Sequence, residues 1–303
     1  MSDGRRIKVR VPASTANLGS GFDVLGLALA LYNTIEIEAT TRGVELTIEG
    51  EGAERLRKVG DRSLVLRGAR ATFDYLGVPA PGLKVHLKNE IPLKRGLGSS
   101  ATACLGGVIA AAALTGRSLS PDEILRLALP LEGHPDNLTP ALVGGLTVTS
   151  LSERGVRYIK IPIPEAVKVV AVVPDMELGT AEARRALPRQ VPLADAVHNV
   201  GRAALLVAAM AAGDLSFLDE ATRDRLHQPY RAKLIPGMEE VLGAARRAGA
   251  LAAFLSGAGS TVAALVDRDA EKVGGEMAET WARKGMRSQV KVLTVEHEGA
   301  KLS

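Results

Sequence analysis

The sequence is poor in cysteine and in aromatic residues. Cys104 is the single cysteine among 303 residues, so no disulfide can form within the chain, as is typical of proteins from a reducing compartment. It lies among alanines and glycines, and no basic residue beside it would make the thiol a nucleophile. Aromatic residues make up 3% of the chain, too few for the stacking platforms that bind single-stranded nucleic acid.

A strong net charge and long apolar runs are also missing. Lys and Arg number 38 against 34 Asp and Glu, a net charge of +4, which gives no electrostatic case for nucleic acid. Arg5 and Arg6 precede an alternating segment and not the apolar core of a signal peptide. The apolar run 101–114 is shorter than the ~20 residues of a membrane span. We therefore expect a cytoplasmic protein with one large or two medium domains and no nucleic-acid or membrane partner.

One stretch predicts a binding site for an anion. It is formed by Pro92, Leu93, Lys94, Arg95, Gly96, Leu97, Gly98, Ser99, Ser100 and Ala101. Residues 83–91 before it alternate like a half-buried strand, and residues 101–114 after it form an apolar helix. The free N–H groups of the loop and of the first helical turn would converge on one point, where the helix dipole is positive.

The type of phosphate loop follows from its spacing. Gly96-x-Gly98-x-x-Ala101 fits the dinucleotide fingerprint, but residues 118–131 predict a capped helix where that fingerprint needs a strand and an acid. No lysine follows Gly98, which excludes the Walker pattern. A purely structural glycine turn stays open. Otherwise the hydroxyls of Ser99 and Ser100 bind phosphate or Mg²⁺, with Glu132 as a second oxygen ligand.

The rest of the chain alternates between strand and helix patterns. Pro162 and Pro164 mark a boundary between two halves. Apolar spacing predicts helices at 63–76, 121–131, 180–188, 193–212, 236–248 and 270–284, with a short turn at 139–142. Strands are predicted at 6–11, 34–39, 44–49, 146–150, 156–161, 167–173, 250–255, 261–266 and 289–295, and residues 12–23 as turns.

Three motifs in order resemble the GHMP kinases. They are Pro-Ala-Ser-Thr-Ala-Asn-Leu-Gly-Ser-Gly-Phe-Asp at 12–23, the loop at 92–101, and Leu-Ser-Gly-Ala-Gly-Ser-Thr-Val at 255–262. The segments 132–137, 180–188 and 227–231 resemble the members of this family that act on homoserine. The resemblance implies an α+β fold of two domains. Residues 1–163 would form the ATP-binding domain with a left-handed βαβ crossover, and residues 164–303 a ferredoxin-like domain. Family members are often dimeric, so a homodimer is possible here.

The resemblance also implies an activity and its residues. The γ-phosphoryl of ATP would pass to the side-chain hydroxyl of L-homoserine, a step of threonine biosynthesis. Residues 92–101 would hold the phosphates, Ser63 would lie near the adenine, and Mg²⁺ would sit between Glu132 and Ser100 or Ser99. Substrate binding would fall to Asn17, Asp23, His134, Asn137, Arg184 and Arg231, and catalysis to Asn137, Arg184 and His134.

The side-chain chemistry agrees with an amino-acid substrate. Asp23 suits the ammonium, and the arginines suit the carboxylate or the transferring phosphoryl. An amide is a poor proton acceptor, so Asn137 would orient the hydroxyl and no strong base would act; His134 as the base is the alternative. Two other functions compete with this one. The protein could be a related kinase that acts on mevalonate, shikimate or a sugar, or a catalytically inactive family member that serves as a binding module.

Structural roles compete with these assignments. Asp23 could cap a helix near Val24, Glu132 and Asp136 could satisfy turn N–H groups, and residues 256–260 could be a plain hairpin turn. We expect Asp136 to point away from the site. His86 is expected to be exposed, and the remaining histidines, His198, His227 and His297, to be structural.

Overall fold

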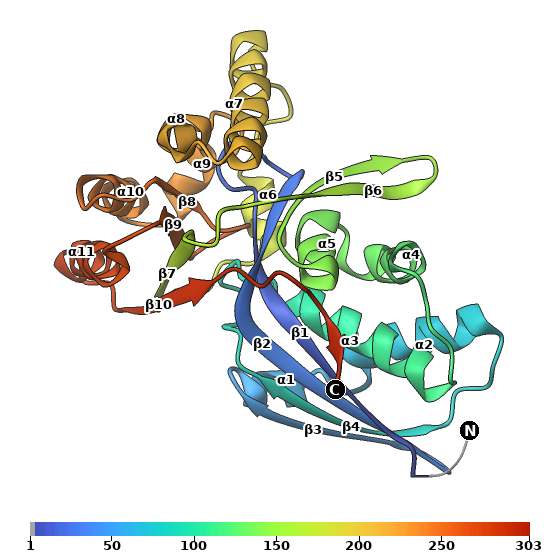
Figure 1. The fold of residues 1–303 in the computed structure, drawn as a ribbon. Coiled ribbons are helices and arrows are strands. Elements are labelled where there is room, and N and C mark those ends of the chain that lie inside the picture. The colour runs from blue at the N-terminus through green and yellow to red at the C-terminus, as the bar shows by residue number, and fades with distance from the viewer. Residues whose placement is uncertain (1–3) are drawn as a thin grey trace.

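The computed structural model describes residues 4–303, which form two β-sheets with helices on their outer faces (Figure 1). The first sheet has seven strands in the order β11-β1-β2-β4-β3, with β5 paired to β2 and β6 to β5. Only β3 and β4 are parallel among the strand pairs of the described residues. The strands are β1 (Arg6–Ala16), β2 (Leu25–Thr40), β3 (Val44–Gly50), β4 (Gly82–Asn89), β5 (Leu146–Ser152), β6 (Gly155–Ile161) and β11 (Lys301–Leu302).

The helices of the first half cover one face of this sheet. They are α1 (Ala53–Arg57), α2 (Leu64–Leu76), α3 (Ser99–Leu114), α4 (Pro121–Glu132) and α5 (Pro135–Val143). Apolar side chains of the sheet, α2, α3 and α4 share one core, and α3 is apolar on every side because neighbours surround it. The connection from β3 to β4 through α1 and α2 is the predicted crossover, and its handedness stays a prediction.

The second sheet is antiparallel in the order β10-β7-β9-β8. If its four strands are numbered 1 to 4 along the chain, this is the order 4-1-3-2 of the predicted ferredoxin-like half. Its strands are β7 (Lys168–Pro174), β8 (Ala252–Leu255), β9 (Val262–Val266) and β10 (Ser288–Thr294). Helices α10 (Met238–Arg247) and α11 (Ala270–Arg283) pack on one face. The other face packs on α7 and on β2 of the first sheet, so the two halves share a core. The remaining helices are α6 (Thr180–Arg185), α7 (Leu193–Ala212), α8 (Leu218–Ala221) and α9 (Gln228–Arg231).

Two helix ends follow the predicted signals. The Ser120 hydroxyl accepts a hydrogen bond from the N–H of Glu123, whose carboxylate accepts one from the Ser120 N–H. This reciprocal pair is a capping box at the start of α4. At the end of α2, Gly77 adopts φ 65°, which a glycine reaches without strain.

The predicted strands and turns near the N-terminus need correction. Residues 12–16 are strand and not turn, because β1 runs to Ala16 with a register shift between Pro12 and Ala13. A proline normally indicates the end of a strand, but a bulge tolerates a proline within one. Pro12 was therefore wrongly interpreted as the start of a turn. No helix starts near Val24, since β2 begins at Leu25, and this removes a capping role for Asp23. The strand β11 and the helix α1 were not predicted.

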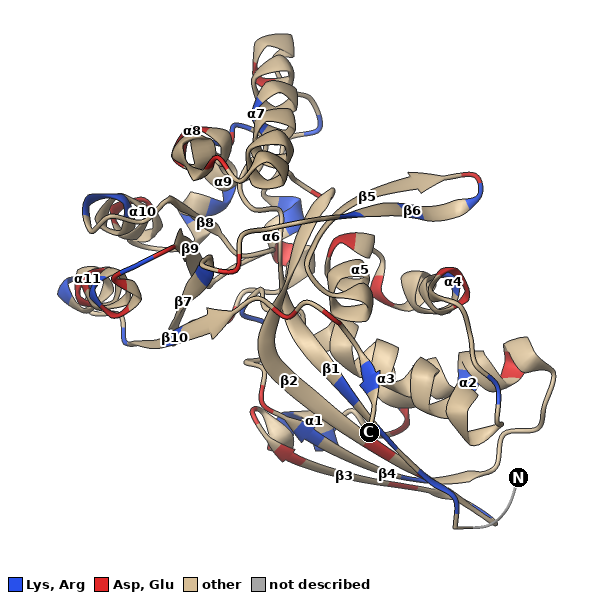
Figure 2. Cartoon of the chain, in the orientation of Figure 1, with Lys and Arg blue, Asp and Glu red and all other residues tan. Residues whose placement is uncertain are grey.

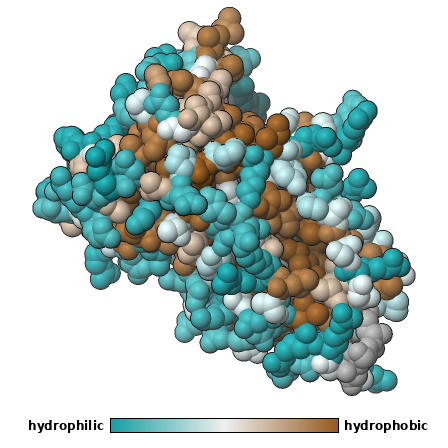
Figure 3. All heavy atoms as spheres, in the orientation of Figure 1, coloured by the Kyte–Doolittle hydropathy of each residue, from teal (hydrophilic) through white to brown (hydrophobic). Residues whose placement is uncertain are grey.

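Helix α7 differs from the expectation that no segment could span a membrane. By length and composition it qualifies, with 20 residues and a mean hydropathy of 1.2, and 22% of it is buried. Figure 3 shows apolar residues gathered over α7, among them Leu193, Val197 and Val200, which are 63–80% exposed. Asn199 on the same helix is buried and hydrogen-bonded to Ser20, which ties α7 to the first half of the protein.

Two glycines let α2 and α3 cross at close range. A Cβ at Gly107 would lie 2.1 Å from the carbonyl oxygen of Val65, and one at Gly68 would lie 2.6 Å from that of Cys104. Each contact is to backbone, which cannot turn aside as a side chain can. The position of α3, whose first residue ends the phosphate loop, therefore depends on glycine at this crossing.

We predict that Gly107→Ala lowers the free energy of unfolding by about 2–4 kcal/mol, because the two helices must move apart. Gly275→Ala is the matched control. It lies in the exposed part of α11 with no atom within 4 Å of the added Cβ, so it should raise stability by about 0.5–1 kcal/mol. Urea unfolding followed by circular dichroism measures both, and equal effects would contradict the packing argument.

Candidate active site

The candidate site is a cavity of about 530 Å³ where the two halves of the protein meet. It is lined by residues of the first motif, the 92–101 loop, the turn 257–259, α5 and α6. Figure 2 shows that basic residues of α6 lie in the middle of the molecule, next to this meeting point. All the predicted site residues except Ala101 line the cavity: Asn17, Asp23, Ser63, the loop residues 92–100, Glu132, His134, Asn137, Arg184 and Arg231.

Backbone hydrogen bonds join the three motifs directly. The N–H of Ser14 donates to Leu97, that of Gly257 to Ala16, and that of Thr261 to Arg95, over 3.1–3.2 Å. The Ser256 hydroxyl lies 2.7 Å from the carbonyl oxygen of Gly96. Residues 256–261 join β8 to β9, so the turn is a hairpin loop and also a support for the phosphate loop.

The 92–101 loop leads into the N-terminus of a helix, α3, as the sequence predicted. Gly98 is the N-cap of α3 with φ 74°, and the helix begins at Ser99, two residues earlier than expected. A Cβ at Gly96 would lie 2.0 Å from the Ser256 carbonyl oxygen, and one at Gly98 would lie 2.3 Å from the Ser14 hydroxyl. Only glycine fits these two positions. The free N–H groups of the first turn of α3 lie at the cavity.

The two serines have different partners. The Ser99 hydroxyl is buried and donates to the Asn89 side chain over 3.1 Å. The Ser100 hydroxyl lies 2.5 Å from the Glu132 carboxylate. Burial raises the pKa of Glu132 to about 7, and the hydrogen bond from Ser100 opposes this shift. A cation between Ser100 and Glu132 would offset the loss of water around the half-buried carboxylate, so the residues present fit a magnesium ion.

The two basic residues of the loop also differ. Arg95 is largely buried, and its Nη1 has no partner among the described residues. Its Nη2 lies 3.7 Å from Asp175. The Lys94 ammonium lies 4.0 Å from Glu177, which also pairs with Arg55. Arg95 is therefore the better-placed charge for an anion in the cavity.

Opposite the loop, two arginines and a carboxylate lie together. Arg184 of α6 donates to Asp23 over 2.7 Å, and its Nε has no partner among the residues that the structure describes. Arg231 of α9 is 2% exposed, and burial and the nearby Arg184 lower its pKa to about 10. Arg231 therefore stays charged at neutral pH, and an anion between the two guanidinium groups would offset their repulsion.

Asn17 contributes mainly to the backbone geometry. Its amide nitrogen donates to Gly257 over 2.8 Å, and its amide oxygen accepts from the N–H of Asp23 over 3.0 Å. Asn17 and Asp23 adopt positive φ values of 72° and 59°, which Asn and Asp tolerate better than most residues. Asn17 thus holds Asp23 in place and joins the first motif to the 257–259 turn.

Helix α5 brings three polar side chains to the cavity, because it begins at Pro135 and not within the short turn predicted at 139–142. Ser14 donates to the Asn137 amide oxygen over 2.9 Å, which turns the amide N–H groups of Asn137 to other partners. His134 is the N-cap residue, and burial and the nearby Arg184 lower its pKa.

Asp136 was expected to point away, but it lines the cavity. It is 4% exposed, and its Oδ1 has no partner within the described part of the chain. Burial and the charge of Asp23 raise the pKa of Asp136 to about 7. Sequence reasoning missed this carboxylate, although its neighbours Pro135 and Asn137 place it in the first turn of a helix.

Apolar residues also line the cavity. Leu56, Val59, Leu64 and Leu93 line it together with Ser63. The first two come from the unpredicted α1 and the turn after it. No group of three or more His, Cys, Asp and Glu among the described residues could hold a metal by itself. The cavity lining therefore includes apolar residues, the 92–100 loop, and a group of charges of both signs.

Comparisons with known proteins agree with this geometry. The family model for the GHMP kinases N terminal domain matches residues 63–145, and that for the GHMP kinases C terminal matches residues 206–283. The chain is 45% identical to a homoserine kinase of Aquifex aeolicus over 98% of this chain and 99% of that protein. It is 46% identical to one of Moorella thermoacetica over 96% and 98%.

A solved structure extends the likeness to the whole fold. The crystal structure of homoserine kinase from Cytophaga hutchinsonii superposes with a TM-score of 0.91 at 32% identity, covering 100% of this chain and 99% of that one. The α+β architecture, the order of the three motifs and these matches lead to one conclusion: the chain belongs to the GHMP kinase family.

Proposed function

We propose that this protein transfers the γ-phosphoryl of ATP to the side-chain hydroxyl of L-homoserine, forming O-phospho-L-homoserine for threonine biosynthesis. One observation carries the proposal: charges of both signs, from Arg184, Arg231, Asp23 and Asp136, line the same cavity as the phosphate loop. An α-amino acid carries an ammonium and a carboxylate, and it matches this arrangement. The nearly full-length relatives that carry the name homoserine kinase support it.

Arg231 and Arg184 are the proposed partners of the substrate carboxylate. Arg184 is tied to Asp23 by one nitrogen, and its unpartnered Nε is free to bond an anion. The ammonium would lie between Asp23 and Asp136, because Asp136 has an oxygen without a partner. Binding the zwitterion would pair these charges and offset their desolvation.

Asn137 is proposed to orient the reacting hydroxyl. Ser14 already donates to the Asn137 amide oxygen, so the amide NH2 group is the part of Asn137 proposed to donate toward the hydroxyl oxygen. This supports a reaction without a strong side-chain base, in which positioning and charge stabilisation supply most of the rate. His134, held neutral by its lowered pKa, remains the alternative base.

ATP would contact the other two parts of the cavity lining. The loop residues 92–100 and the start of α3 would hold the phosphates, with Arg95 adding charge, and the apolar residues that line the cavity with Ser63 would take the adenine. Ser100 and Glu132 would hold Mg²⁺, which when bound neutralises charge on the phosphate oxygens. Ser99 is not the proposed ligand, because its hydroxyl is committed to Asn89.

The proposed function predicts ADP release and a new phosphate monoester with homoserine, and little turnover of mevalonate or shikimate. Arg184→Lys should lower kcat/KM for homoserine about a hundredfold, since a lysine cannot make the forked contact. Arg185→Lys, an exposed neighbour on α6, is the matched control and should stay near wild type. Coupled ADP assays and ³¹P NMR measure these outcomes; faster turnover of mevalonate than of homoserine would refute the proposal.

The serine assignment predicts a difference in metal dependence. Ser100→Ala should raise the Mg²⁺ concentration for half-maximal activity about tenfold or more, because a ligand is lost. Ser99→Ala removes a hydroxyl that bonds Asn89, so its Mg²⁺ dependence should change less than about twofold. Initial rates over a Mg²⁺ titration at saturating ATP decide; the opposite order would assign the metal to Ser99.

We predict that replacing Asp136 by asparagine raises the stability of the protein and lowers its activity. The pKa of Asp136 rises from 3.8 to about 7 on folding, so between these values the folded state binds more protons and stability falls as pH increases. Asp136→Asn removes this cost. Its Tm should exceed that of wild type by about 3 °C or more at pH 8 and by a clearly smaller margin at pH 5, where folding wild type costs only part of the full proton uptake. Its KM for homoserine should rise about tenfold or more. An equal Tm difference at both pH values, by scanning fluorimetry, would contradict the buried charge.

A further inference from the structure

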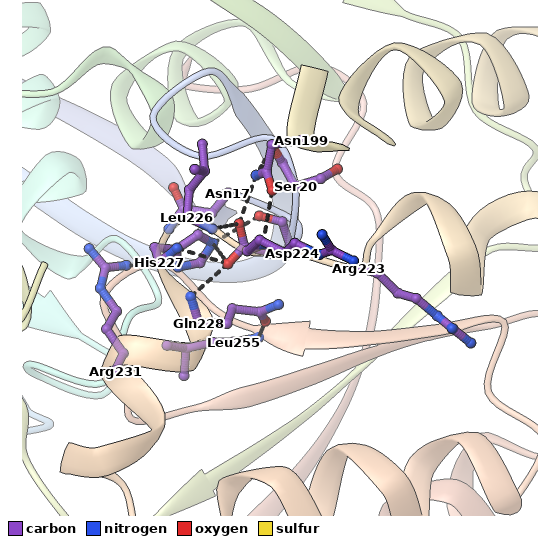
Figure 4. Close-up of polar contacts among 12 residues, drawn as sticks. Asn17, Ser20, Asn199, Arg223, Asp224, Leu226, His227, Gln228, Arg231 and Leu255 are labelled. Atoms are coloured by element: carbon purple, nitrogen blue, oxygen red, sulfur yellow. Dashed lines mark hydrogen bonds and ion pairs between the residues drawn. The ribbon is translucent and has the colours of Figure 1, made fainter. Parts of the chain in front are cut away.

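A buried network behind Arg231 plays no part in the proposed chemistry. Its centre is Asp224, whose side chain has no exposed area. Figure 4 shows the side chains and N–H groups that converge on this carboxylate. One oxygen accepts from the Asn199 amide over 2.7 Å and from the N–H of Leu226 over 2.9 Å. The other accepts from the N–H groups of His227 and Gln228 over 2.9 and 2.6 Å.

Asp224 thereby fixes the turn that starts α9, and this turn carries two side chains with distant partners. The Gln228 amide oxygen accepts from the N–H of Leu255 over 2.6 Å, just before the 256–260 turn. The His227 ring contacts Gly19 of the first motif and Arg231 one turn further along α9. The network thus links the loops around the cavity from behind.

The hydrogen-bond partners of His227 determine its tautomer. Nε2 lies 2.8 Å from the carbonyl oxygen of Gly19, which can only accept, so Nε2 carries the proton. Nδ1 lies 3.3 Å from Nη1 of Arg231, which can only donate, so Nδ1 accepts and carries no proton. The ring is neutral, in agreement with burial and Arg231 lowering the pKa of His227 to about 4 against the opposing charge of Asp224.

The donors of Arg231 can be accounted for one by one. Nε donates to Ala183 over 3.4 Å, and the two N–H groups of Nη1 point to Gly257 over 3.0 Å and to His227. A guanidinium has five N–H donors, so the two on Nη2 are left, and the hydrogen bonds of Arg231 within the described residues do not use them. The ring of Phe22 stacks on His227 at 4.9 Å and lies 5.2 Å from the guanidinium carbon, which limits rotation of both groups.

We propose that His227 is a positioning residue for Arg231. Its unprotonated Nδ1 takes the second Nη1 proton, so that the Nη2 edge of the guanidinium faces the substrate carboxylate. The inference rests on the proposed function, in which that carboxylate binds Arg231. Without the acceptor, Nη1 keeps a buried N–H unpaired, because Arg231 is 2% exposed and His227 is fully buried. The guanidinium would then rotate toward another acceptor, and Nη2 would no longer face the substrate carboxylate.

Two substitutions separate the two ring nitrogens. His227→Asn keeps an acceptor at the place of Nδ1 and loses the bond to Gly19, whereas His227→Gln keeps a donor at the place of Nε2 and loses the acceptor for Arg231. Both lose the stack on Phe22, so each is the control of the other. We expect His227→Gln to raise KM for homoserine about tenfold or more, with KM for ATP within about twofold of wild type. His227→Asn should stay within about threefold for both substrates. Equal effects of the two variants on KM for homoserine would overturn the proposal.

A measurement on the unmutated protein covers the case in which neither variant folds. In protein labelled with ¹⁵N-histidine, long-range ¹H–¹⁵N spectra between pH 6 and 8 should show one ring in the Nε2–H tautomer that does not titrate. A titrating ring, or the Nδ1–H tautomer, for His227 would overturn the proposal. This spectrum does not depend on the substrate. Absence of homoserine phosphorylation by wild type would therefore refute the proposed function and leave the tautomer test intact.

Discussion

The site depends on main-chain hydrogen bonds that hold three distant loops against one another. Residues 14–16 bond residues 97 and 257, and residue 261 bonds residue 95. These hydrogen bonds join main-chain atoms of all three motifs. A larger side chain in one loop therefore cannot be accommodated by moving that loop alone, because the movement would break its bonds to the other two. Glycine at 96 and 98 follows from this contact, since a Cβ there would strike the neighbouring loop. The motifs are spread over the whole chain, yet in space they form one unit.

The charges of the site are arranged at a cost to the free protein. Burial and the neighbouring Arg184 lower the pKa of Arg231, and loss of contact with water raises the pKa values of the Glu132 and Asp136 carboxyl groups. The charged form of each of these groups would be more stable in water. Binding a partner of opposite charge replaces the hydration that the group loses in the folded protein. A kinase site of this kind gains affinity and orientation from the same contacts, because charges without internal partners are available to the ligand.

Much of this could be predicted from the sequence, because the signals were local. The capping box of α4, the glycine stop of α2 and the glycine-serine loop before α3 each depend on a few adjacent residues. Features set by distant contacts could not be predicted. Residues 12–16 pair with β2, Asp136 is carried into the cavity by a helix, and His227 meets Arg231 and Gly19 only after folding. Histidine and aspartate reveal such roles only through their surroundings.

The short strand β11 closes the first sheet with the end of the chain. Lys301 and Leu302 pair with Arg10 and Val9 of β1, and the preceding Glu296 bonds Ala28 and Gly145 through its backbone. The polypeptide thus crosses between the halves twice, once before β7 and once after β10. Two covalent connections between the halves oppose a wide hinge rotation of one half relative to the other. They favour small sliding movements of the two halves instead. Because β11 follows the strands of the second sheet in the sequence, the first sheet cannot be completed before those strands have been synthesised.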